Sequence, residues 1–417
     1  MTRTFRPSRG VKGFLYCVTI KDIRIYRRRN RSLSTIARLK GFNFFYFALF
    51  ALFISFLPVY SAGVGVSGTR IGIILGFGSL ISIFAQPLWG MVSDKNRTIK
   101  KVLLLLLTAS MLVGTLLYRA DTVWSLVVLV ALMNVFYLPT DSLVESLNFQ
   151  TSQREKVGYG SVRMFGALGY ACVSLTAGFA LKQWGMSSLS WIFLGMGAIA
   201  LILAFGLSDV QASSSSRASF VQLKSFFGQS HTWAFFLVVL IVAIPHKMND
   251  TFIGLYMEQL GGDVRSTGMS WFIMTLTETV MFAVSSRLIK SGKEAQWMTV
   301  AAGLYALRFL LSSLIGSPYG LVALQVFQGF TFVIFYVGAM QYLYRIVPEQ
   351  WKSTGQTVLT ATFFSVSGII GSTVGGWVIE HFGGASLYKF MAVLALAGFG
   401  MGLALVKRSG AQATGGA

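Results

Sequence analysis

The sequence predicts an all-α polytopic membrane protein with twelve transmembrane helices arranged in two six-helix halves. First, 54% of the residues are hydrophobic, only 12% are charged, and 35 are phenylalanines. Second, apolar runs of about 20 residues, the length that a helix needs to cross about 30 Å of hydrocarbon, recur at close intervals. Third, a serine-rich stretch at residues 209–231 interrupts the apolar pattern halfway along the chain, as expected of a flexible connector.

The apolar runs divide evenly around this connector. They fall at residues 41–63, 69–93, 101–118, 122–148, 160–183 and 187–208, and then at 232–258, 268–290, 295–315, 318–346, 353–381 and 385–406. We therefore expect a basic leader, an N-terminal half, a linker, a C-terminal half and a tail, at residues 1–40, 41–208, 209–231, 232–406 and 407–417.

The positions of the basic residues predict the orientation in the membrane. A net charge of +21 would suggest a nucleic-acid partner in a soluble chain, but here Lys and Arg cluster in the leader, in alternate loops and in the tail. Few basic residues fall on the opposite side: Arg70, Arg119, Lys182, Arg265 and Lys389. Because cytoplasmic loops carry an excess of Lys and Arg, we expect a multi-pass protein of the cell membrane with both termini in the cytoplasm and no nucleic-acid partner.

The basic leader has no cleavage site after its short apolar run at residues 13–20, so a removed signal peptide is not expected. Two interpretations remain. The leader is either a disordered cytoplasmic tail attracted to anionic lipid or the product of a start codon assigned too early, and we favour the second. The leader is therefore predicted to be dispensable up to about Leu33. The two cysteines, Cys17 and Cys172, provide no disulfide framework.

An arginine in an apolar run marks the first candidate site. Arg163 lies nine residues after the loop residue Arg154, and Glu145 lies nine residues before it, so two helices joined there would hold both at matching depth. A charge in hydrocarbon usually faces a bundle interior or an aqueous cavity. We expect the two residues to pair and to form the centre of a binding site. The alternative is an ion pair that only holds the two helices together.

Asp141 lies one turn before Glu145 on the same helix face, and Pro139 just ahead of it is expected to open the backbone. Two acids on one face are a candidate proton site. The alternative is that a lysine such as Lys247 keeps Asp141 ionised.

A second polar cluster lies near the bilayer midplane in the run 232–258. Lys247 and Asp250 are three residues apart, so they either neutralise one another or reach the cavity. His246 follows Pro245; it either titrates near neutral pH or is a packing and hydrogen-bonding residue.

The loop after the second span, QPLWGMVSDKNRTIKK at residues 86–101, joins a small residue, an acid and several bases. Gly90 is expected to permit close helix approach, Asp94 to cap or pair, and Lys95 to hold the loop inside. This loop is similar to a signature of the major facilitator superfamily, in which the acid helps to latch one conformation of the carrier.

Further motifs narrow the resemblance to the lactose permease and nucleoside/proton symporter branch, over residues 41–406. The matching positions are Pro87, Leu88, Gly90, Ser93 and Asp94, then Gly160, Arg163, Met164, Phe165, Gly166 and Gly169, and finally Glu145, Glu278 and Arg308. The resemblance implies substrate binding by Glu145, Arg163, Tyr170 and Glu278. Two positions depart from the family, because a histidine and a glutamate used for proton coupling there read Gln328 and Thr331 here.

The leading hypothesis is proton-coupled import of a small polar solute, such as a sugar, oligosaccharide or nucleoside, by alternating access. One alternative is efflux of amphipathic or aromatic compounds on the same fold, and another is a membrane receptor or scaffold that does not transport. No enzyme activity, cofactor or metal is expected, and the partners are the solute, protons and the lipid bilayer around a monomer. The proton-coupling candidates are Glu278, Arg308, Asp141, Asp250 and His246.

We expect Glu278 to be the coupling acid. Gln328 and Thr331 cannot exchange a proton, and separating Glu278 from Arg308 would drive its protonation. A permanent pair of these two residues, with uniport as its consequence, is the alternative.

Overall fold

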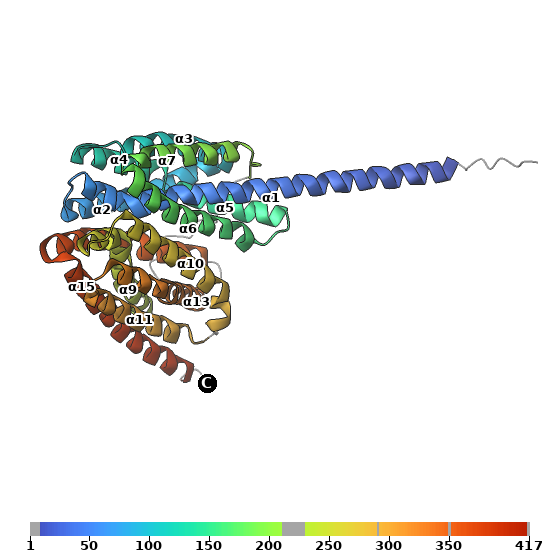
Figure 1. Cartoon of the computed structure of the whole chain (residues 1–417). Coiled ribbons are helices and arrows are strands. Elements are labelled where there is room, and N and C mark those ends of the chain that lie inside the picture. Colours follow the sequence, from blue (N-terminus) through green and yellow to red (C-terminus); the bar gives the residue numbers. More distant parts are fainter. Residues whose placement is uncertain (1–8, 211–229, 290–291, 349–351, 415–417) are drawn as a thin grey trace, which may run out of the picture.

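The computed structural model describes residues 9–210, 230–289, 292–348 and 352–414, and every regular element among them is a helix (Figure 1). The N-terminal half contains α1 (Arg9–Gly63), α2 (Gly68–Asn96), α3 (Ile99–Leu117), α4 (Val123–Phe136), α5 (Thr140–Arg154), α6 (Tyr159–Trp184) and α7 (Ser188–Phe205). The C-terminal half contains α9 (Ser230–Gln259), α10 (Val264–Leu288), α11 (Glu294–Leu314), α12 (Pro318–Leu324), η1 (Gln325–Phe327), η2 (Gly329–Val333), α13 (Ile334–Ile346), α14 (Lys352–Thr360), η4 (Ala361–Val366) and α15 (Ser367–Thr414).

These helices are consistent with twelve membrane crossings. Within the described residues, ten helical stretches are long and apolar enough to span a membrane. The last of them, Thr354–Lys407, turns at Gly383, where a φ of 78° breaks the helix, so its 54 residues hold two crossings. The 25-residue α10 adds another helix of sufficient length. The predicted all-α fold class is confirmed.

The predicted fourth span is divided into α4 and α5. The chain turns at Tyr137–Pro139, because a proline has no N–H for the helical ladder and its ring obstructs the preceding turn. Tyr46 of α1 and Thr140 of α5 share a hydrogen bond of 2.8 Å between their hydroxyls, and Tyr137 donates to the Tyr46 carbonyl at 3.0 Å. These bonds fix the direction of α5, the helix that carries Asp141 and Glu145.

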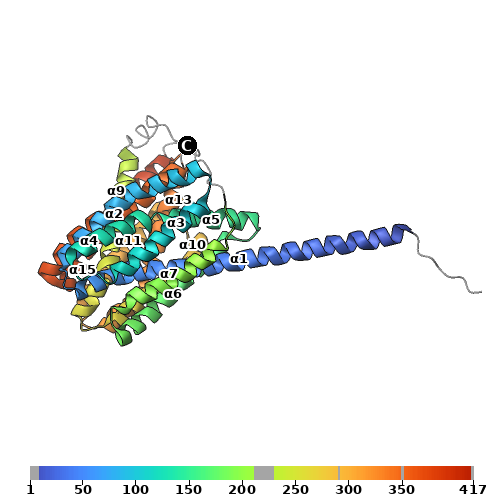
Figure 2. The same ribbon diagram turned by 90° about the horizontal axis from the view of Figure 1, so that it is seen from above.

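The first helix includes most of the basic leader. The helix α1 begins at Arg9 and extends far beyond the bundle in both views (Figures 1 and 2). The segment that precedes the first apolar run contains no proline after residue 7, so nothing in it interrupts the helix. Residues 1–8 lie outside the described part, as do residues 211–229 of the linker and 415–417 of the tail.

The two halves meet closely at one end of the bundle, where α2 packs on α15 and α6 packs on α10. A Cβ atom at Gly72 would lie 2.1 Å from the Ser372 carbonyl oxygen, and one at Gly268 would lie 2.4 Å from the Ser174 carbonyl oxygen. Only glycine permits such backbone contact.

Two hydrogen bonds also join the halves at this end. Lys182 lies 2.5 Å from Asp263, and the Thr69 N–H donates to Glu380 at 2.7 Å. In the orientation predicted from the basic residues, this closed end faces outward.

Candidate functional site

The predicted pair of Glu145 and Arg163 is present. Arg163 Nε of α6 lies 2.7 Å from Glu145 Oε1 of α5, and the Tyr159 hydroxyl donates to the other carboxylate oxygen, Oε2. The guanidinium also stacks 3.9 Å from the centroid of the Phe47 ring on α1. The Arg163 and Glu145 side chains are still 37% and 29% exposed. Three helices therefore hold a charged pair that water can reach.

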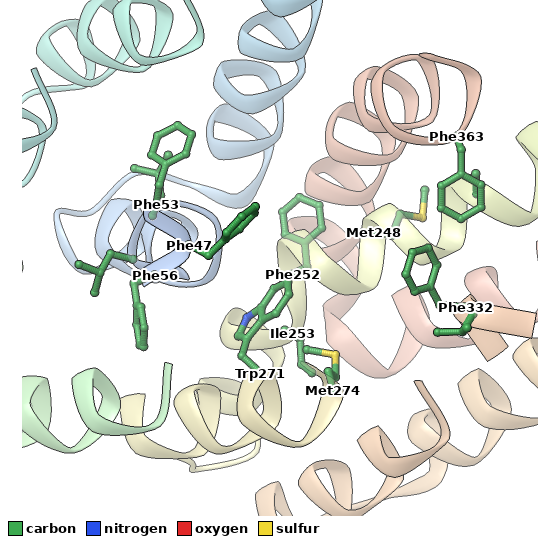
Figure 3. Packing of buried hydrophobic residues seen from close by; sticks show 14 of the residues in the cluster. Phe47, Phe53, Phe56, Met248, Phe252, Ile253, Trp271, Met274, Phe332 and Phe363 are labelled. Atoms are coloured by element: carbon green, nitrogen blue, oxygen red, sulfur yellow. The ribbon is translucent and has the colours of Figure 1, made fainter. Parts of the chain in front are cut away.

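Aromatic side chains connect this pair to the other half. The Tyr170 hydroxyl lies 3.0 Å from Ser55 Oγ, and its ring centroid lies 5.7 Å from that of Trp271 on α10. Phe47 on α1, Phe252 on α9 and Trp271 on α10 lie near one another between the halves (Figure 3). Tyr170 thus lies where the halves meet. Sequence reasoning missed Trp271 and Phe47, because each lies on a helix remote in sequence from Arg163, and it missed Tyr159, which lies one turn before Arg163 on α6.

Asp141 is half-buried on α5, one turn from Glu145 as expected. Both Glu145 and Arg163 lie close enough to act electrostatically on its carboxylate. The described residues include no ion pair of Asp141, so the alternative of a lysine partner is not observed: Lys247 lies beside Asp250 instead. The structure brings Asp141 into the same charged group as the Glu145–Arg163 pair.

Among the described residues, no ion pair joins Glu278 to Arg308 in this conformation, so the alternative of a permanent pair is not observed. Arg308 is 2% exposed, and its hydrogen bonds go to the amide oxygens of Gln325 and Gln328 and, at 3.2 Å, to Thr331 Oγ1. These three acceptors lie along the short η1 and η2 turns, where the helix departs from α geometry. Departures of this kind are frequent at functional sites. Both terminal nitrogens of the guanidinium are thus bound by neutral oxygens and not by the carboxylate.

Glu278 lies on α10 near this cluster and is half-buried. Gln328, Asp250 and Arg308 all lie close enough to act electrostatically on its carboxylate. Gln328 therefore stands between the acid and the arginine. Its amide can accept from Arg308 through the oxygen and donate to Glu278 through the nitrogen.

The α9 cluster is assembled around Asp250. Lys247 Nζ and His246 Nε2 lie 3.4 Å and 3.5 Å from Asp250 Oδ2, so the predicted local pairing with Lys247 is present and a histidine joins it. His246 is 3% exposed, its Nδ1 lies 3.1 Å from the Tyr305 hydroxyl, and its ring stacks on Phe332. The histidine is thus a packed, hydrogen-bonded residue.

The residues of the loop between α2 and α3 lie at the end of the bundle opposite the glycine contacts. Asp94 and Lys95 are exposed, and a Cβ atom at Gly90 would meet nothing within 4 Å, so the close approach expected at Gly90 is not present here. A contact of Asp94 that latches this end of the bundle would be broken when this end is open. The nearby Thr98 and Asp209 are joined by a hydrogen bond of 2.5 Å, which ties the end of the N-terminal half to the start of α3.

No group of three or more His, Cys, Asp or Glu side chains in the described segments has an arrangement suited to a metal ion. Two helical halves that pack together at one end, with charged residues inside their spanning helices, are typical of membrane carriers.

Comparison with known proteins places this carrier in a family. The model described as "MFS_1 like family" matches residues 36–390, so the chain belongs to this family of the major facilitator superfamily, and the predicted resemblance is confirmed. The chain is 24% identical over 376 residues to the uncharacterized transporter YwbF of Bacillus subtilis (strain 168), covering 89% of this chain and 93% of the relative. It is also 24% identical over 376 residues to the maltose permease of Geobacillus stearothermophilus, covering 89% and 95%.

A solved structure has the same fold. The crystal structure of the nucleoside transporter NupG superposes with a TM-score of 0.77 at 16% sequence identity, covering 90% of this chain and 98% of that one. The protein is therefore a multi-pass membrane transporter that acts on small molecules.

Proposed function

We propose that this protein imports a small polar solute, a sugar, oligosaccharide or nucleoside, together with protons. The observation that carries the proposal is the Glu145–Arg163 pair, which is exposed to water although it lies within spanning helices of a bundle closed at the opposite end. A paired guanidinium and carboxylate offer fixed donors and acceptors to hydroxyl groups. Tyr170 and Trp271 provide ring surfaces nearby. The relatives named as maltose permease and nucleoside transporter favour the same solute classes.

The C-terminal half supports proton coupling through Glu278. Arg308 Nε is buried without a hydrogen-bond partner among the described residues, while its other nitrogens are held by neutral oxygens. One guanidinium donor is thus left for Glu278 when the acid is ionised. Release of the proton would draw Arg308 towards Glu278, and protonation would return it to the amides.

The energy would come from the membrane gradients. Moving one charge across 100 mV is worth about 2.3 kcal/mol, enough to concentrate a solute roughly fiftyfold for each coupled proton. In the proposed orientation both termini face the cytoplasm, and the end of the bundle that is closed by glycine contacts faces outward.

Uptake into proteoliposomes tests the proposal. Glu278→Gln is expected to abolish uphill accumulation driven by a pH gradient and to spare solute exchange, because exchange needs no net proton movement. Asp141→Asn tests the competing proton-coupling candidate and is expected to retain uphill accumulation. If Glu278→Gln still accumulates solute, Glu278 is not the coupling acid. If the wild-type protein equilibrates solute without responding to the pH gradient, it is a uniporter.

A further inference from the structure

The interior of the C-terminal half contains a chain of polar side-chain contacts that runs from Arg308 to Asp250. Arg308 donates through NH1 to Gln328 Oε1. Gln328 Nε2 lies 3.5 Å from His246 Nδ1, and His246 Nε2 lies 3.5 Å from Asp250 Oδ2. The chain thus joins α11, the η1–η2 junction and α9 through side chains alone.

The donor and acceptor roles in this chain follow from one fixed group. A guanidinium is only a donor, so the Gln328 atom that faces it must be the oxygen, and the amide nitrogen must face His246. The Tyr305 hydroxyl also lies 3.1 Å from the same imidazole nitrogen, Nδ1. With the amide hydrogens on one side and this hydroxyl on the other, Nδ1 is suited to accept. The proton of the neutral ring is then on Nε2, which faces Asp250.

The packing around the imidazole prevents the ring from escaping this arrangement. The His246 ring lies parallel to Phe332, with centroids 4.7 Å apart and an interplanar angle of 9°, and its centroid lies 5.3 Å from that of Phe363. Phe332 and Phe363 lie together beside α9 (Figure 3). Because Phe332 stacks on the face of the imidazole and limits its movement, the ring can respond to a change in its neighbours most easily by changing its tautomer.

We propose that Gln328 is a positioning residue that sets the tautomer of His246 and so directs the imidazole Nε2–H onto Asp250. The charged or titratable groups that face His246 are Lys247 and Asp250 on α9 and Tyr305 and Arg308 on α11. Lys247 Nζ and His246 Nε2 then both face Asp250 Oδ2 as donors. Its other oxygen, Oδ1, is buried without a hydrogen-bond partner in the described part of the chain.

The consequence for transport rests on the proposed function of Glu278. When Arg308 turns to an ionised Glu278, Gln328 loses the donor that fixes its amide. A flipped amide presents its oxygen to Nδ1, which favours a proton there and withdraws the Nε2–H from Asp250. The protonation state of Glu278 is in this way passed to the Lys247–Asp250 pair on α9.

Nitrogen-15 NMR of the histidine rings tests the relay in the whole protein, which contains only three histidines. His231→Gln and His381→Gln assign the other two signals. We expect wild-type His246 to be a neutral ring protonated on Nε2. Gln328→Glu is expected to remove this signature, because a carboxylate would then face Nδ1 and favour a proton there.

Gln325→Glu is the matched control, since Gln325 accepts from the other Arg308 nitrogen and touches no histidine. It places the same new charge beside Arg308 and is expected to leave the His246 tautomer unchanged. A wild-type ring protonated on Nδ1, or equal responses of the two variants, would overturn the proposal. The spectrum needs no transport, so the relay is judged even if Glu278→Gln still accumulates solute.

Discussion

The two halves use an arginine within the membrane in opposite ways. Arg163 in the N-terminal half pairs directly with Glu145 at 2.7 Å and is 37% exposed. Arg308 in the C-terminal half is 2% exposed and is bound by two amides and a hydroxyl, with its acid held apart. A direct pair at a watery surface presents a fixed polar shape, which suits binding. A buried arginine with neutral ligands leaves its acid free to change charge, which suits coupling.

The largest expected effect separates these roles by removing Arg163. Arg163→Ala is expected to weaken solute binding by at least about 100-fold, since hydrogen bonds to charged groups contribute up to about 3 kcal/mol and Glu145 would lose its partner. A thermal-shift screen of sugars, nucleosides and aromatic acids would first identify the solute, and calorimetry would give the affinity. Arg119→Ala is the control, because Arg119 lies over Trp191, away from the pair. Unchanged affinity in Arg163→Ala would refute the assignment of the site.

For protein stability, we expect the order of the two arginines to be reversed. Arg308→Ala is expected to lower the melting temperature of the purified protein more than Arg163→Ala, at a cost of about 3 kcal/mol or more, because it leaves a buried cavity and removes the shared donor of three buried groups. The Arg163 side chain is more than one third exposed, so water replaces much of what it loses. Equal melting temperatures would show that the buried arginine does not stabilise the fold.

These contrasts could be predicted from the sequence only in part. The lengths of the apolar runs place the helices well, as at Ser188–Phe205 for the expected run 187–208, because span length depends on the thickness of the hydrocarbon. The pairing of Glu145 with Arg163 also follows from spacing, since both helices leave one short loop.

The ligands of Arg308 were not predictable in the same way. They depend on how α11 packs against the η1 and η2 turns, and a periodic pattern does not reveal a local departure from α geometry. The contact between Tyr170 and Trp271 joins the two halves, and spacing within one half carries no information about it.

A smaller effect is expected from the hydroxyl that orients Glu145. Tyr159→Phe removes the donor to Glu145 Oε2 and leaves the ion pair, so solute affinity is expected to fall several-fold, or by about 1 kcal/mol. Tyr344→Phe is the matched control. Tyr344 is similarly exposed and donates to Gln356 at 2.8 Å, in the half whose arginine is buried. Identical affinities for the two variants would show that Tyr159 does not orient the pair.

Loss of the Lys182–Asp263 contact between the halves, here called the outer contact, is expected to have a small effect that does not depend on pH. Burial tends to raise the pKa of Asp263, but hydrogen bonds from Arg265 and Lys182 outweigh it and hold the pKa well below its usual range. A lowered pKa means that the pair is intact above about pH 4 and is lost only when the pH falls further. Lys182→Met is therefore expected to shift the closed state by at most about 1 kcal/mol, equally at about pH 5.5 and about pH 7.5.

Distances between spin labels at the outer ends of α6 and α10, in a protein without Cys17 and Cys172, would measure this shift. A shift that differs between the two pH values would mean that the outer contact itself senses protons, and the division between a binding half and a coupling half would then fail.

The smallest expected effect concerns how each half begins. The N-terminal half is preceded by the long extension of α1, whereas α9 begins at Ser230. Among the side chains of α1 that the structure describes, the first buried ones are Ile36 and Leu39, and the Lys40 ammonium lies 4.9 Å from the centroid of the Phe165 ring on α6. Residues 2–32 precede all of these contacts, so deleting them is expected to leave solute affinity and uptake unchanged. Uptake per expressed molecule tests this, and a loss of uptake at equal expression would give the extension a role in the transport cycle.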